Sequence, residues 1–92
     1  MNSSQPLLTA VEISLYPLQD NYLEVIRWFI QQLDGHPGIE RHTNGMSTQL
    51  QGPHDALFAL LAGTSAAAYR KFGRAVFVCK FIPGGVNLEH RE

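Results

Sequence analysis

The segment RHTNGMSTQLQG, residues 41–52, carries a dense run of hydroxyl and amide side chains. Hydroxyl and amide side chains both donate and accept hydrogen bonds, so a run of them needs hydrogen-bonding partners. Asn44 and Gly45 form the dipeptide typical of a type I′ hairpin turn with two central residues. The arms on either side, residues 39–43 and 46–51, are therefore predicted to be paired strands.

A loop of two residues fixes which side chains share a face of this hairpin. Thr43 then lies across from Met46, and Arg41 lies across from Thr48. Thr43 and Thr48 fall on the same face as the apolar Leu50, so part of the polar set is expected to look into the interior, where hydroxyls need partners. A small ligand is one such partner. The alternative is that the polar arms form only a hydrated surface.

The predicted hairpin also places His42 across from Ser47, the one visible pairing of a nucleophile with a base. Catalysis would also need a third group that orients the base, and cross-strand pairs of this kind arise by chance. Cys79 lies in an apolar run without a neighbouring base, so it is expected to be a small core residue. We therefore expect no enzyme and assign no catalytic residue, and an enzyme using Ser47 and His42 is the third hypothesis.

Histidine spacing gives no support for a metal site. No known ligand motif fits the positions, and the residues fall in a predicted turn, strand, helix start and tail. They are expected to be hydrated side chains, so neither a metal nor a cofactor is predicted. The four histidines are His36, His42, His54 and His90.

Composition indicates one small globular domain. The chain has 92 residues, of which 45% are hydrophobic and 16% are charged, enough for one core. The core is expected over about residues 8–85, with tails at 1–7 and 86–92. The formal net charge is -1 and no basic run is longer than Arg70–Lys71, which disfavours binding to nucleic acid.

The amino-terminal segment MNSSQPLL has no basic region and no long apolar run. It is therefore expected to be neither a signal peptide nor a membrane anchor, and no membrane partner is predicted. The single Cys79 excludes an internal disulfide, which fits a reducing compartment. The expected location is the cytoplasm.

Hydrophobic periodicity predicts a strand and then a helix in the first part of the chain. Residues 8–16 alternate between an apolar face and a face that carries Glu12, Ser14 and Tyr16. Asn21 and Glu24 offer a capping box for a helix over 22–33. The apolar stripe of that helix is expected at Tyr22, Ile26, Phe29, Ile30 and Leu33.

A second helix follows the hairpin. Pro53 suits its first turn, Asp55 lies near its positive end, and Gly73 closes it. Whether Gly63 breaks this helix is left open. Its apolar stripe is expected at Leu57, Leu60, Leu61, Ala68 and Phe72.

The last strand is predicted over residues 75–82, and it is apolar on both faces. The resulting order is βαββαβ, which is typical of the ferredoxin-like α+β sandwich. Right-handed crossovers place both helices on one face of a four-stranded antiparallel sheet, with the first and third strands central. Because one register of the last strand must lie on the open face, a second copy is expected to cover it, in a homodimer or homotetramer.

Three segments together resemble a known family: ISLYPLQDNYLEVI (13–26), TNGMSTQLQG (43–52) and AVFVCKFIPGG (75–85). They are similar to the YkoF-like family that binds thiamine and hydroxymethylpyrimidine, and to the related small thiamine-binding domain proteins. The likeness spans about residues 9–85. Its motifs are LYPL, MST followed by Gly52, and a final strand that ends in Pro-Gly, in the same order as in the family.

The resemblance implies a ferredoxin-like unit that binds thiamine or its pyrimidine moiety without chemistry, in vitamin salvage or transport. Family members carry two such units in tandem or assemble single units, and this chain is similar to the single-unit form. Since residues 82–85, IPGG, lack the cysteine of the tandem members, the ligand stays open between thiamine, hydroxymethylpyrimidine and a similar small heterocycle. The family's pocket segments fall on Ser14, Tyr16, Asn44, Met46, Ser47 and Thr48.

Two further features bear on this ligand. Tyr16 and Met46 are expected to supply flat or adaptable apolar walls, and Glu12 or Asp20 to attract the cationic thiazolium of thiamine.

The alternative function is a structural or regulatory homo-oligomer whose open sheet face binds protein partners.

Overall fold

The computed structural model describes residues 7–87, so most of both predicted tails and His90 lie outside the described part of the chain. The observed order is βαββαβ, as predicted. The elements are β1 (Leu8–Pro17), α1 (Tyr22–Gln32), β2 (Glu40–Thr43), β3 (Thr48–Pro53), α2 (His54–Phe72) and β4 (Ala75–Pro83). Within residues 7–87, no helix is both long and apolar enough to cross a membrane.

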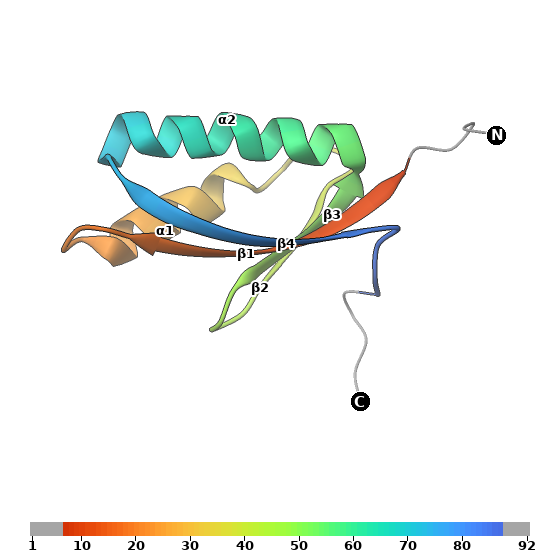
Figure 1. The fold of residues 1–92 in the computed structure, drawn as a ribbon, viewed down its shortest axis with the longest axis horizontal. Coiled ribbons are helices and arrows are strands. Elements are labelled where there is room, and N and C mark those ends of the chain that lie inside the picture. Colours follow the sequence, from red (N-terminus) through yellow and green to blue (C-terminus); the bar gives the residue numbers. More distant parts are fainter. Residues whose placement is uncertain (1–6, 88–92) are drawn as a thin grey trace.

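The strands form one antiparallel sheet in the order β2-β3-β1-β4, so β1 and β3 are central as predicted. Both helices lie on the same face of this sheet, and the tip of the β2–β3 hairpin extends to the side away from α2 (Figure 1). This is the ferredoxin-like α+β sandwich. The opposite face of the sheet carries no element of the described chain (Figure 1).

The core lies between the helices and the buried face of the sheet. Strict alternation along β1 turns Val11 and Ile13 toward the helices, where 2% and 3% of their surface is exposed. Burying a side chain of this size stabilises the fold by roughly 1.5–3 kcal/mol. The central cluster consists of Val11, Ile13, Phe29, Leu33, Leu50 and Leu57.

The start of α1 differs from the predicted capping box. The Asn21 side chain caps no backbone N–H, and its amide Nδ2 instead donates to Glu24 Oε1 at 3.3 Å. The buried stripe runs through Val25, Phe29 and Leu33, whereas Tyr22, predicted to belong to it, is half-exposed. Ile26 and Ile30, also predicted to belong to the stripe, border a cavity described below.

The hairpin is the clearest correction to the sequence prediction. Thr43 pairs with Thr48, not with Met46, and Arg41 pairs with Leu50. Gly45 does not have a positive φ, so the turn is not type I′. The Asn44 side chain accounts for the difference, since its Oδ1 accepts hydrogen bonds from the Met46 and Ser47 backbone N–H groups at 2.8 and 3.1 Å.

The register shift leaves the predicted faces unchanged. The observed pairing moves β3 by two residues relative to the prediction, and two is the period of side chains along a strand. Thr48 therefore still faces inward beside Leu50, with 6% and 0% of their surfaces exposed. The expectation that part of the polar set looks into the interior is confirmed.

Helix α2 runs without a break past Gly63. Pro53 is its N-cap residue and not, as predicted, part of its first turn. Thr64 is buried along with the apolar stripe of α2. Its hydroxyl can be buried because it donates a hydrogen bond to the Leu60 carbonyl at 2.8 Å. Phe72, at the end of the helix, packs edge-to-face against Trp28 of α1 with ring centroids 5.5 Å apart.

Strand β4 divides its apolar residues between the two faces, as its sequence required. Phe77 and Cys79 pack against the core. Val76, Val78 and Ile82 lie on the open face, each with about half of its surface exposed. An apolar stripe thus crosses the uncovered side of the sheet.

We expect Gly52→Ala to destabilise the fold. Gly52 is buried in β3 opposite Thr9, and an added Cβ would lie 2.9 Å from both the Gly38 carbonyl oxygen and Ile39 Cγ1. Because one of these atoms belongs to the backbone, residues 38–39 must shift. The shift is expected to lower the free energy of unfolding by about 1–3 kcal/mol. Urea unfolding followed by circular dichroism measures the change in the free energy of unfolding.

Gly63→Ala is the matched control. No atom lies within 4 Å of the added Cβ, and alanine is favoured over glycine in a helix interior by about 0.8–1 kcal/mol. The control is expected to raise the free energy of unfolding. An unchanged or more stable Gly52→Ala protein would show that residues 38–39 do not pack on β3 as described.

Candidate functional site

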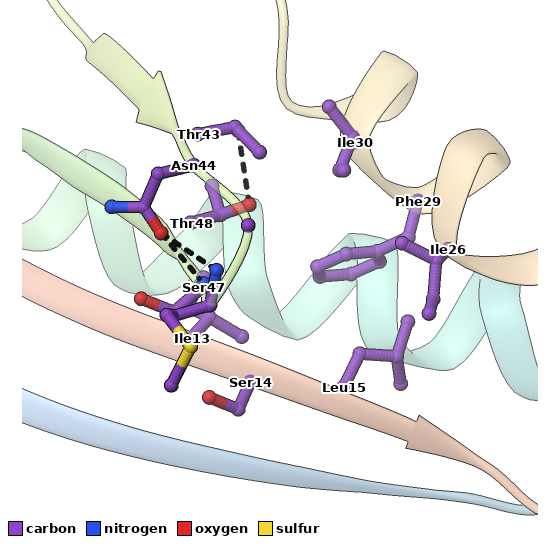
Figure 2. Close-up of a pocket in the computed structure, with 12 residues that line it drawn as sticks. Ile13, Ser14, Leu15, Ile26, Phe29, Ile30, Thr43, Asn44, Ser47 and Thr48 are labelled. Carbon is purple, nitrogen blue, oxygen red and sulfur yellow. Dashed lines mark hydrogen bonds between the residues drawn. The ribbon is translucent and has the colours of Figure 1, made fainter. Parts of the chain in front are cut away.

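A cavity of about 140 Å³ opens between the hairpin loop, β1 and α1 (Figure 2). Its lining joins hydroxyl and amide groups from the loop to apolar side chains from the helix. The lining residues are Ile13, Ser14, Leu15, Ile26, Phe29, Ile30 and residues 43–48. No ionised side chain is among them.

The unequal pairing of β1 creates this cavity. Its pairing with β3 ends at Ile13 opposite Thr48, whereas its pairing with β4 continues to Pro17. Beyond Ile13, the side of β1 that faces β3 therefore borders a gap. Side chains of α1 close the gap from the helix side of the sheet (Figure 2).

The helix wall is apolar. Ile26, Phe29 and Ile30 lie on consecutive turns of α1, and Figure 2 shows the Phe29 ring extending toward the loop and Ile26 extending toward Leu15. Phe29 is held by the core, where its ring packs against Phe77 with centroids 5.2 Å apart. Ile26 and Ile30 are only partly buried, which leaves apolar surface available inside the cavity.

The loop wall of the cavity is polar, and Thr43 and Thr48 form part of it. The Thr43 and Thr48 hydroxyls lie 3.0 Å apart, and Arg41 Nη1 donates to Thr43 Oγ1 at 2.6 Å. Since Thr43 already accepts from the guanidinium, it can donate its proton to Thr48, which frees the Thr48 hydroxyl to donate in turn. The Arg41 charge is itself paired with Asp34.

The loop hydrogen bonds determine which polar atoms remain available. Asn44 uses its Oδ1 within the loop, and within residues 7–87 its Nδ2 has no hydrogen-bond partner. Ser47 Oγ donates to Glu12 Oε2 at 2.8 Å and accepts from Gln49 Nε2 at 2.9 Å. Ser47 thus ties the loop to β1, while Asn44 keeps two free donor positions.

Five of the six predicted site residues line the cavity together. Ser14, Asn44, Met46, Ser47 and Thr48 meet there, although Met46 is 87% exposed at the loop tip. Tyr16 does not line the cavity. It lies on the open face opposite Val76 and, unlike Ser14, is not among the lining residues.

Sequence reasoning missed the apolar wall as part of the site. Ile26 and Ile30 were expected in the core stripe of the first helix, and nothing in their spacing distinguishes a cavity wall from a core. One signal was present: with Val25 included, the apolar arc of residues 22–33 is wider than one buried face requires. Thr43, a polar lining residue that was also missed, had been expected to face inward.

The predicted pair of His42 and Ser47 is not formed. His42 lies opposite Gln49, and its Nε2 lies 2.7 Å from Glu40 Oε2. The hydroxyl of Ser47 is directed to Glu12 instead. The two-residue shift of the hairpin register is the cause.

The described histidines are partnered, not simply hydrated as predicted. His36 Nε2 donates to the Gln32 carbonyl at 2.8 Å, and His54 Nδ1 lies 2.7 Å from the buried Thr9 hydroxyl. Within residues 7–87, no group of three or more His, Cys, Asp or Glu side chains is placed to hold a metal ion. Burial raises the pKa of the Cys79 thiol, which keeps it protonated at neutral pH as a packing group.

Comparison with known proteins supports the fold. No protein-family model matches the chain, and the comparison with curated proteins also gives no match. Among solved structures, a Thermotoga maritima protein described as a proposed thiamine biosynthesis or salvage protein is similar. Its TM-score is 0.78 at 17% identity, over 89% of this chain and 91% of that one.

Two other solved structures are similar in the same way. A Streptococcus pneumoniae protein gives a TM-score of 0.76 at 18% identity, over 86% of this chain and 89% of that one. A domain of unknown function, DUF77, from Bacillus cereus gives 0.72 at 19% identity, over 96% and 89%. At these identities the likeness establishes the shared ferredoxin-like fold.

Proposed function

We propose that this protein binds, without catalysis, a small flat heterocycle of the thiamine and hydroxymethylpyrimidine class, in vitamin salvage or transport. The observation that carries the proposal is the cavity itself: an apolar helix wall faces a loop of uncharged hydroxyl and amide groups. A ring with polar edges and apolar faces matches these walls. The similarity to the Thermotoga maritima protein supports the same ligand class.

Cavity size favours the pyrimidine moiety as the part that is held. Sites for drug-sized ligands are typically about 300–1,000 Å³. A cavity of about 140 Å³ is smaller and suits a single substituted ring. The thiazolium ring of thiamine would then lie outside, toward the exposed Met46.

The uncharged lining of the cavity also favours the pyrimidine moiety over the thiazolium ring. Since no ionised side chain lines the cavity, nothing in it neutralises a phosphate or a cationic ring. Glu12, considered for the thiazolium, is engaged by Ser47 and lies 3.7 Å from Lys80 Nζ. Asp20 is not among the lining residues. A neutral aminopyrimidine fits this environment best.

We further propose that the protein works as a homo-oligomer through the open sheet face. Tyr16, Val76, Val78 and Ile82 expose between 46% and 56% of their surfaces on one side of the sheet. Lys80 and Glu12 lie on the same face with opposite charges and 3.7 Å apart, so this face has no excess charge that would repel a second copy. A second copy is therefore a better fit to this face than a partner of one charge sign.

Titration of purified protein tests the ligand class. Hydroxymethylpyrimidine and thiamine are expected to bind within about tenfold of each other, because both present the same ring to the cavity. The isolated thiazole alcohol is expected to give no heat. Calorimetry measures all three, and neither heat nor a thermal shift with roughly millimolar pyrimidine would contradict the proposal.

We expect Thr48→Val to weaken pyrimidine binding about tenfold, or about 1.4 kcal/mol. The change keeps the side-chain shape and removes a hydroxyl that lines the cavity. Thr64→Val is the matched control, since Thr64 is equally buried but lies on α2 away from the cavity. Equal effects of the two variants on the dissociation constant would mean that the Thr48 hydroxyl does not contact the ligand.

Light scattering after size exclusion tests the assembly. The protein is expected to run as a dimer or tetramer, and Val78→Lys, which places a charge in the apolar stripe, is expected to shift it toward monomer. Tyr69→Lys on α2 is the control, because Tyr69 is 63% exposed on the helix side. A monomeric parent protein would disprove the assembly.

A further inference from the structure

The backbone N–H and C=O groups of successive β1 residues point alternately to β3 and to β4. This alternation determines the direction of the Leu15 backbone groups. The Leu8 carbonyl accepts from Gly84 N–H at 2.6 Å beyond the end of β4. The Leu7 carbonyl accepts from His54 N–H at 2.8 Å beyond the end of β3. Even-numbered residues of β1 therefore direct their N–H and C=O groups to β4, and odd-numbered residues direct theirs to β3.

Both registers along β1 are unbroken, so the alternation extends to Leu15. Its N–H and C=O groups point toward β3 at a level where β3 has already ended. The residue that would continue the register is Met46, which the loop carries away from the sheet. The loop closes on itself instead, with Asn44 N–H donating to the Ser47 carbonyl at 3.1 Å.

The Leu15 main chain is consequently unpaired within the described part of the chain. No hydrogen bond joins it to the loop, and Leu15 is one of the residues that line the cavity. A backbone donor and acceptor lying side by side form the edge that a neighbouring strand normally satisfies. At this position the cavity takes the place of the strand.

We propose that the Leu15 N–H and C=O groups recognise the ligand by pairing with a ring nitrogen and the amino group next to it. The ring nitrogen accepts from the N–H, and the amino group donates to the C=O. This selects heterocycles that carry an amino group beside a ring nitrogen, as 4-aminopyrimidines do. The inference rests on the proposed function, because it concerns the same cavity and specifies the ligand edge.

The geometry also explains how an uncharged cavity can be selective. Apolar contacts with Ile26, Phe29 and Ile30 accept any flat ring, so they discriminate poorly. A ligand without the matching edge leaves a backbone donor and acceptor without partners in a site from which the ligand excludes water. Rejection of the wrong ring thus comes from the main chain of β1.

Amide hydrogen exchange, followed by NMR on the full chain, tests the proposal with internal controls. In the free protein, the Leu15 amide is expected to exchange at least tenfold faster than those of Ser14 and Tyr16, which face β4 opposite Val78 and Val76. Saturating hydroxymethylpyrimidine is expected to slow Leu15 at least tenfold and to leave the two neighbours unchanged.

A ligand analogue tests the other half of the pair. Replacing the amino group of hydroxymethylpyrimidine by methyl keeps the ring size and removes the donor to the Leu15 carbonyl. Calorimetry is expected to show binding weakened about tenfold or more.

The outcomes separate this inference from the proposed function. Hydroxymethylpyrimidine that binds without slowing Leu15 exchange, or a methyl analogue that binds equally well, would overturn the main-chain recognition and leave the pyrimidine-binding function standing. Protection of Leu15 in the free protein would also overturn it. Absence of any binding would overturn both.

Discussion

The unequal pairing of β1 is the constraint on which the rest of this structure depends. The strand must bond to β3 and β4 at once to make a sheet, yet β3 leaves it at Ile13 and β4 follows it to Pro17. The shared part anchors the core through Val11 and Ile13. The unshared part gives up backbone pairing on one side, and α1 and the hairpin loop surround the opening. Core and cavity are two consequences of one register.

The order of elements was predictable because it depends on local periodicity. Alternation along residues 8–16, a helical stripe after Asn21 and an apolar run at residues 75–82 each identify one element. The hairpin turn was not predictable in the same way. Asn44 can adopt a positive φ or can use its side chain as an acceptor, and the same dipeptide is compatible with both. Because the resulting error was two residues, the inward orientation of Thr48 survived it.

The candidate site was likewise only partly predictable from the sequence. Its polar wall is a contiguous run of sequence, so hydroxyl and amide chemistry reveals residues 43–48 directly. Its apolar wall comes from α1, where Ile26 and Ile30 read as core residues until the position of the loop is known. Tyr16 shows the opposite failure, because it follows the lining residue Leu15 directly in sequence and still does not line the cavity. The free main chain of Leu15 has no sequence signature, since every residue has an N–H and a C=O except proline.

The two outer strands of the sheet differ in how well they resist unwanted pairing. At one margin, β2 is only four residues long, and its Glu40, Arg41 and His42 are charged or polar. At the other, β4 runs for nine residues with Lys80 as its only charged side chain. A long, mostly apolar border strand with unpaired N–H and C=O groups is the kind that natural sheets usually protect. When this protein is concentrated or partly unfolded, misassembly should therefore begin along β4.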